Sequence, residues 1–281
     1  MRKQAWSWGL AAGLAVAGMA DASAEPLLAL TSGNVLVRLD SATPGSFTGV
    51  VPVTGLAAGE SLVGIDVRPA SQQLYGLGVT AAGIARLYVL NPNTGVASLV
   101  GTLASDPADP TSPYTLLSGT RIGMDFNPVP DRLRVVTDSG LNLRINPNTA
   151  LVISDTNLNG AATGVGAAAY LNNYSGATST TLYDLDAASD TLLVQNPPNN
   201  GTLVLVGALG VDATNAIGFD ILTVGGVNTA FATLQVGGVT GLYTINLGTG
   251  AATLVGNLAS SPLVLEIATL TPDLVYANGF E

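Results

Sequence analysis

One pattern recurs along this chain at a spacing of about fifty residues, which is typical of a propeller blade of four strands. Each copy has an apolar strand around Gly-x-Asp, two further strands, a turn of the Asn-Pro-Asn-Thr-Gly type, and a fourth strand ending in Leu-Val-Gly. The copies span residues 27–53, 61–103, 119–156, 165–209 and 216–258. The fourth copy is degenerate, and the first lacks the Gly-x-Asp strand.

The strand missing from the first copy has a counterpart at the other end of the chain. A single apolar segment, LVLEIATLTP, follows the fifth copy. A strand from one end that completes a blade begun at the other closes a ring and leaves no open sheet edge. The sequence therefore predicts an all-β fold, a five-bladed β-propeller of four-stranded blades, with Leu263–Leu270 as the inner strand of the blade that starts at Leu27. A β-sandwich is the alternative, but it does not explain the regular period.

Four segments carry a resemblance to a known family. They read GESLVGIDVRPASQQLYGLG, RIGMDFNPVPDRLRVVTDSGLNLRINPNT, TSTTLYDLDAASDTLLVQNPPNNGTL and GLYTINLGTGAATLVG. The chain resembles a family of secreted bacterial proteins that is known only as a domain of unknown function. The resemblance implies propeller-like repeats and export, and it implies no activity. One departure is Ala150, which stands where the turns ending at Gly95 and Gly250 have glycine. If the turns share their geometry, Ala150 has a left-handed backbone.

The first 24 residues have the order of a secretory signal peptide. Arg2 and Lys3 form a positive start, residues 9–20 are apolar, and Ala22-Ser23-Ala24 is a small-x-small cleavage site. The apolar run is shorter than the ~20 residues of a bilayer span. We expect residues 1–24 to be removed, residues 25–281 to form one propeller domain, and the protein to reach the periplasm or the extracellular medium. No membrane span is expected in the mature chain, which we expect to be a monomer.

Composition excludes several functions. The whole chain has 19 acidic and 9 basic residues, and loss of residues 1–24 removes Asp21, Arg2 and Lys3, leaving 18 acids and 7 arginines. A mature net charge of −11 argues against nucleic acid and anionic membranes as partners. The chain has no cysteine and no histidine, which excludes disulfides, a Ser-His-Asp triad, a cysteine nucleophile and a zinc site with histidine ligands.

Three acids occupy the Gly-x-Asp position: Asp66, Asp125 and Asp220. Carboxylates around a propeller axis can act as acid, base or metal ligands. Alternatively, each Asp accepts backbone N–H groups and fixes the packing of the blades. In the remaining inner strands Ala168 and Thr269 are expected at the same position, which interrupts the ring of acids and favours the structural role.

Four arginines gather in the third copy: Arg121, Arg132, Arg134 and Arg144. Arg132 and Arg134 lie two apart on one strand and therefore face the same side, and Arg144 is on the next strand. Such a cluster can bind a carboxylate, sulfate or phosphate. The alternative is pairing with Asp125, Asp131 and Asp138.

Residues 155–160, Asp-Thr-Asn-Leu-Asn-Gly, match the start of a calcium loop, with Asp155, Asn157 and Asn159 as ligands. Gly166 stands where such a loop has its bidentate Glu, and an Asx-rich turn explains the same residues.

We therefore expect an exported, non-enzymatic propeller that binds an unidentified ligand or protein, without a required cofactor. The long connection at residues 102–120 is expected to project from the binding face. The alternative is a calcium-dependent hydrolase that acts on a glycan or lactone through acids lining the channel.

Overall fold

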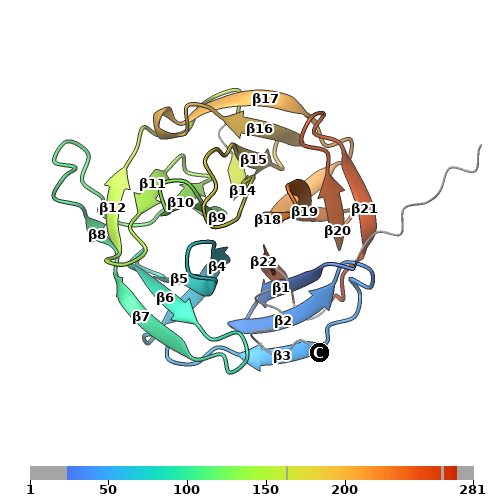
Figure 1. Cartoon of the computed structure of the whole chain (residues 1–281), viewed down its shortest axis with the longest axis horizontal. Helices are drawn as coiled ribbons and strands as arrows, with labels where there is room; N and C mark the ends of the chain where they lie inside the picture. The colour runs from blue at the N-terminus through green and yellow to red at the C-terminus, as the bar shows by residue number, and fades with distance from the viewer. Residues whose placement is uncertain (1–23, 163, 261–262, 271–281) are drawn as a thin grey trace, which may run out of the picture.

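The computed structural model describes residues 24–162, 164–260 and 263–270. Almost all of this part is β-structure, arranged as five separate sheets around an axis (Figure 1). Residues 1–23, which hold most of the predicted signal peptide, lie outside the described residues. Within the described ranges, no helix has the length and apolar character needed to span a bilayer.

Each sheet is one blade, and its strands follow one another from the axis outward. Blade 1 contains β22 (Val264–Thr269), β1 (Pro26–Thr31), β2 (Val35–Asp40) and β3 (Gly49–Pro52). Blade 2 contains β4 (Glu60–Arg68), β5 (Gln73–Thr80), β6 (Ala85–Leu90) and β7 (Ala97–Thr102). Blade 3 contains β9 (Ile122–Asn127), β10 (Arg132–Thr137), β11 (Asn142–Ile145) and β12 (Leu151–Ser154), with β8 (Ala104–Ser105) at its outer edge. Blade 4 contains β14 (Val165–Tyr170), β15 (Leu182–Asp186), β16 (Thr191–Gln195) and β17 (Thr202–Ala208), with β13 (Asn159–Gly160) outside and the 3-10 helix η1 (Pro198–Asn200) before β17. Blade 5 contains β18 (Ala213–Val224), β19 (Val227–Val236), β20 (Val239–Ile245) and β21 (Ala252–Asn257).

The predicted closure of the ring is confirmed. β22 pairs antiparallel with β1, with Leu27 opposite Thr269 and Leu30 opposite Glu266. Both strands are almost entirely buried, and Leu27 to Leu30 have no exposed surface. The last described strand is therefore the inner strand of the blade that the N-terminal strands complete (Figure 1).

The blades pack face to face through apolar side chains. One core cluster joins blades 2 and 3 through Tyr75, Met124 and Phe126, and the Tyr75 and Phe126 rings meet edge to face at 5.1 Å between centroids. Another cluster joins blades 4 and 5 through residues that include Ala169, Phe219 and Ile221. At about 25 cal/mol per Å² of buried apolar surface, these interfaces are the main stabilising contribution.

The recurrent turn before the outer strands of blades 2, 3 and 5 is built as the sequence predicts. The Asn91 side chain accepts hydrogen bonds from the N–H groups of Asn93 and Thr94 at 2.9 and 3.0 Å, and Asn246 does the same for its turn. Gly95, Ala150 and Gly250 all have left-handed backbones, with φ of 72°, 58° and 83°. The prediction for Ala150 is thus confirmed, and its fully buried methyl group packs in the core of blades 2 and 3, which offsets the backbone strain.

The long connection from residue 102 to residue 120 differs from the prediction. Only part of it lies at the rim near β8 (Figure 1), because Tyr114 and Leu117 return to the core and are buried. The N–H of Leu117 donates to the carbonyl of Gly83 at 3.0 Å, and the Asp109 carboxylate accepts from the N–H of Ser154 at 2.9 Å. The connection is therefore anchored at both ends and does not project as a whole.

Deleting residues 261–281 removes β22, which exposes the edge of β1 and the surfaces of β4 and β18 against which β22 packs. We expect this protein to aggregate or to lose its cooperative thermal unfolding, measured by scattering and circular dichroism. Deletion of residues 271–281 alone retains β22 and is the matched control. A monomeric 261–281 deletion with the melting curve of the control would contradict the closure.

Candidate functional site

The five inner strands approach one another so closely at the axis that small residues are required. A Cβ atom on Gly123 would lie 2.6 Å from the backbone nitrogen of Ala168 in the next blade. A Cβ atom on Gly218 would lie 2.6 Å from Glu266 Oε1 and 2.7 Å from the backbone nitrogen of Ile267. The glycine of Gly-x-Asp thus lets adjacent inner strands come into contact, and this places the acid two residues later at the axis.

The three sequence-predicted acids meet there. One carboxylate oxygen from each of Asp66, Asp125 and Asp220 lies within 4.8 Å of the others, and each residue is only 1–2% exposed. Asp66 accepts hydrogen bonds from its neighbour Val67 at 2.6 Å and from Phe126 of the next blade at 2.7 Å. Asp220 likewise accepts from Ile221 at 2.6 Å and from Thr269 of the next blade at 2.5 Å. These two acids therefore link adjacent blades, as the structural interpretation expected.

Asp125 is different, because both of its carboxylate oxygens are buried without a hydrogen-bond partner in the described part of the chain. The N–H of Tyr170 lies close enough to lower the pKa of Asp125 somewhat, although its geometry is not that of a hydrogen bond. Arg134, the register partner of Asp125 on β10, donates to other groups.

The alignment of the other two inner strands is corrected by the structure. Asp66 accepts from the residue after Asp125, and Asp220 accepts from Thr269, so the equivalent acid position on β22 is Ala268. Ala168 packs back against blade 3, in the cluster between blades 3 and 4. Ala169 packs toward the next blade, blade 5, and is therefore the residue at the acid position of β14. The same bulge occurs just before the glycine position in β4, β14, β18 and β22, so it does not shift the pattern. At the corresponding positions β14 and β22 lack both the glycine and the aspartate of Gly-x-Asp, so the sequence had no fixed point from which to align them.

A fourth acid at the axis, Glu266, was missed from the sequence. Its Oε1 accepts the N–H groups of Phe219 at 3.2 Å and Ile267 at 3.1 Å, and the residue is 2% exposed. It stands where the other strands have the glycine, two residues before the acid position. A single acid in an apolar strand, VLEIAT, is the only signal that the sequence offered.

Burial dominates the electrostatics of these acids. Desolvation, followed by repulsion from Asp220, raises the pKa of Asp66 well above its usual value. Desolvation and then repulsion from Asp66 and Asp220 raise the pKa of Asp125 in the same way. The pKa of Glu266 is also raised well above normal by desolvation, and burial raises the pKa of Asp220 to about 6.

The arginines form a second, separate site between blades 3 and 4. A pocket of about 410 Å³ is lined by Arg132, Arg134, Arg144, Tyr170 and the loop at 197–200, among others. Arg134 and Arg144 are direct register partners on β10 and β11, as the sequence suggested. Asp66, Asp125 and Asp220 do not line this pocket. Arg121 does not line it either: it precedes the start of β9, whereas the pocket residue Asn127 is at the end of that strand.

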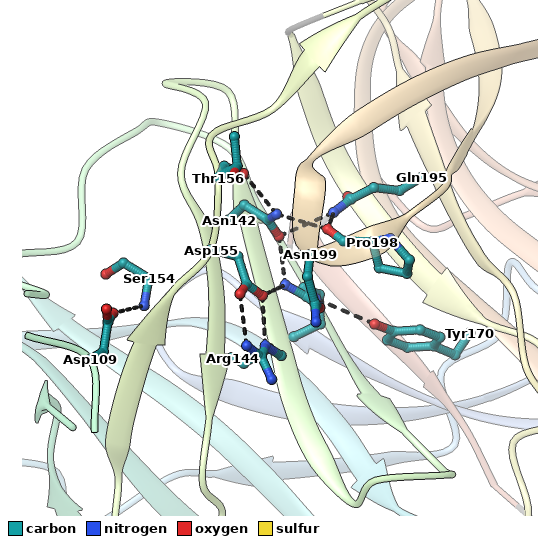
Figure 2. A network of polar contacts seen from close by, with 11 residues as sticks. Asp109, Asn142, Arg144, Ser154, Asp155, Thr156, Tyr170, Gln195, Pro198 and Asn199 are labelled. Carbon is teal, nitrogen blue, oxygen red and sulfur yellow. Dashed lines mark hydrogen bonds and ion pairs between the residues drawn. The ribbon is translucent and has the colours of Figure 1, made fainter. Parts of the chain in front are cut away.

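Asp155 holds two of these arginines. Arg144 Nε and Nη2 donate to both Asp155 oxygens at 2.7 and 2.8 Å (Figure 2), and Arg134 Nη1 donates to Asp155 at 2.7 Å. Arg134 also donates to Asn142 at 2.7 Å and to Asn199 of blade 4 at 2.8 Å. The expected pairing with Asp125, Asp131 or Asp138 is therefore not the one adopted by Arg134 and Arg144.

Asn142 extends this network across the blade interface. Its Nδ2 donates to the carbonyls of Thr156 at 3.0 Å and Pro198 at 2.9 Å, and its Oδ1 accepts from Gln195 at 3.1 Å (Figure 2). The network fixes the loop that carries Pro198 against blade 3 and so defines one wall of the pocket.

The predicted calcium ligands Asp155, Asn157 and Asn159 make contacts within the chain. Both Asp155 oxygens are engaged by arginine, and Asn159 Nδ2 donates to the carbonyls of Asn157 and Asn200 at 2.9 and 2.7 Å. The calcium-loop interpretation stays a prediction, and these contacts argue against it.

Asp184 on β15 is another buried acid. It has no exposed surface, and neither of its oxygens has a hydrogen-bond partner among the described residues. Desolvation raises its pKa to about 8, and the charge of Arg134 only partly offsets this.

The comparisons identify the family. The model of the family described as "Domain of unknown function (DUF4394)" matches residues 35–268, so this chain belongs to that family. No curated protein matches the sequence.

Solved structures agree on the fold alone. A chain of a nidogen/laminin complex is similar with a TM-score of 0.51 at 10% identity, over 88% of this chain and 98% of that one. Glutaminyl cyclase from Myxococcus xanthus is similar with a TM-score of 0.43 at 14% identity, over 84% and 82%. Similarity at 10% identity shows the fold alone, and a fold by itself does not assign a function.

Replacing Arg134 by Ala leaves the buried Asp155 without one of its two partners. The two side chains are 2% and 5% exposed, and breaking such a buried pair costs ~3–5 kcal/mol. We expect a loss of this size in the free energy of unfolding, measured by denaturant titration. Arg132→Ala is the control, since Arg132 donates only to nearby backbone carbonyls. Equal stability of the two variants would contradict a structural role for Arg134.

Asp184 makes a pH-dependent contribution that can be measured. Because its pKa is raised to about 8 in the folded state, its contribution to stability is complete below about pH 4 and is lost as the pH rises toward 8. The loss is up to ~1.4 kcal/mol per pH unit. Asp184→Asn stays neutral, so we expect the variant to be more stable than the wild type at pH 8 and to show a weaker decline between pH 5 and pH 8. Parallel stability profiles for the two proteins would contradict a raised pKa.

Proposed function

We propose that this protein is an exported, non-enzymatic propeller that binds a small ligand bearing a carboxylate, sulfate or phosphate group in the pocket between blades 3 and 4. The observation that carries the proposal is the charge of this pocket. Three arginines line it, and Asp155 pairs with two of them, Arg134 and Arg144. An excess of positive charge in a protein with a net charge of −10 is unusual and favours an anion.

The three arginines have different roles in this proposal. Arg134 is committed to Asp155, Asn142, Asn199 and Tyr170, so it shapes the pocket. Arg144 uses Nε and one Nη for Asp155, and its side chain remains 30% exposed. Arg132 uses one Nη for the carbonyls of Pro130 and Asp131. Arg132 and Arg144 therefore retain N–H groups for a ligand, and a guanidinium suits bidentate contact with a carboxylate or phosphate.

The rigidity of the walls supports recognition over catalysis. Pro197, Pro198 and the network around Asn142 hold one side of the pocket, and strand residues hold the other. The acids that a hydrolase would use lie at the axis with 1–2% exposure, where a glycan or lactone cannot reach them in this conformation. The chain has no histidine or cysteine to supply a nucleophile or base elsewhere.

Isothermal titration with inorganic phosphate, sulfate and citrate, at fixed ionic strength, tests this proposal. We expect saturable binding of at least one anion and a loss of about tenfold or more for Arg132→Gln, since a charged hydrogen bond contributes about 1.5–3 kcal/mol. Arg121→Gln is the matched control, because it removes the same charge outside the pocket. Absence of binding by all three anions, or equal affinity of Arg132→Gln and the wild type, would contradict the proposal.

A further inference from the structure

Blade packing alone does not explain why three carboxyl groups converge at the axis. Asp66 and Asp220 each accept two backbone N–H groups, which is sufficient to link the blades. Asp125 nevertheless lies with both oxygens buried and unpartnered in the described part of the chain, with one of them inside the 4.8 Å cluster. A buried polar group without a partner costs ~1–3 kcal/mol, and more when it is charged.

Arg134, the register partner of Asp125, does not pair with the buried Asp125 carboxylate. Arg134 is opposite Asp125 on β10, but its Nη groups donate to Asn142, Asp155 and Asn199 at 2.7–2.8 Å, and its Nε donates to Tyr170 at 3.3 Å. The guanidinium is thus directed to the pocket between blades 3 and 4. Asp125 is left facing Asp66 and Asp220.

We propose that Asp66, Asp125 and Asp220 bind a divalent cation, with Ca²⁺ as the preferred ion, at the axis of the propeller. Ca²⁺ lies about 2.3–2.6 Å from its oxygen ligands, so ligands on opposite sides are about 4.6–5.2 Å apart. Three oxygens that lie within 4.8 Å of one another therefore fit around one such ion. Glu266 adds a fourth negative charge close by, with one oxygen held by Phe219 and Ile267.

The ligands come from strands that are far apart in the sequence. Asp66 is on β4, Asp125 on β9 and Asp220 on β18, so one ion ties blades 2, 3 and 5 together. Glu266 on β22, in blade 1, places a further acid beside the ion. The ion is therefore a structural element of the propeller, and this role is separate from ligand binding in the arginine pocket.

The pH dependence has a definite sign. The acids that face the site are Asp66, Asp125, Asp220 and Glu266, with Tyr170 beside them on β14 and Arg134 on β10 directed away. Desolvation raises the pKa of all four acids, and repulsion from neighbouring carboxylates adds to it for Asp66, Asp125 and Glu266. Without the ion, protonation relieves the repulsion, whereas the ion requires deprotonated ligands. Calcium should therefore raise the melting temperature more at pH 8 than at pH 5.

The site is buried, so the experiment loads it during folding. Protein expressed without residues 1–24 is unfolded in guanidinium with a chelator, refolded with CaCl₂, with MgCl₂ or with the chelator alone, and desalted. Metal content is measured by mass spectrometry and stability by thermal unfolding. We expect about one Ca²⁺ per chain, little Mg²⁺, and a higher melting temperature for the calcium-loaded protein.

Two variants separate the site from general binding to an acidic protein. Asp125→Asn preserves the side-chain shape and should retain at least tenfold less calcium, while the chelated variant should melt above the chelated wild type because one repelling charge is gone. Asp212→Asn removes an exposed acid and should behave as the wild type does. Calcium retention below about 0.1 per wild-type chain overturns the proposal, whether or not Asp125→Asn refolds. Equal retention by Asp125→Asn and the wild type also overturns it.

Discussion

Close contact between neighbouring inner strands is the constraint on which this propeller depends. The inner strands β22, β4, β9, β14 and β18 pack as a ring, and glycine at Gly123 and Gly218 permits the approach. The ring is complete only because β22, which is last in the chain, pairs with β1, which is first among the described strands. Closure of the ring therefore relies on a contact between segments that are more than two hundred residues apart, and such non-local contacts carry a high entropic cost before they form.

The acids at the axis are a consequence of this packing. Inner strands of adjacent blades do not form a continuous sheet, so some of their N–H groups face the axis without a strand partner. Asp66 and Asp220 satisfy such groups in the next blade, at Phe126 and Thr269. The cost is a concentration of buried carboxyl groups whose pKa values are raised by desolvation. A cation or protons must balance that charge, and either one makes the stability of the ring depend on the composition of the solution.

The sequence predicted the features that recur from blade to blade, and it did not predict the contacts that individual side chains make between blades. The period, the missing first strand and the turn residues predicted five blades, the closure by β22 and the left-handed Ala150, because each depends on backbone patterns that recur. At the corresponding positions β14 and β22 have neither the glycine nor the aspartate of Gly-x-Asp, and the alignment of Ala168 and Thr269 was wrong by one residue for that reason. Repeat spacing does not encode which strands face each other across blades. Three findings depend on that arrangement: the pairing of Asp155 with Arg134 and Arg144, the place of Glu266 at the axis, and the burial of Asp184. The division of the predicted residues into an axial cluster and an arginine pocket has the same origin.

Hydrogen exchange of backbone amides in the intact protein tests the central claim most directly. The account predicts that peptides covering β1 and β22 exchange as slowly as those covering β4 and β9, because all four strands are inner or adjacent strands of one closed ring and open only with global unfolding. Slow exchange in both β1 and β22, with the same dependence on denaturant as β9, is the expected result. Fast exchange of β22 while β4 and β9 remain protected would show that the ring is stable without its last strand, and it would contradict the account.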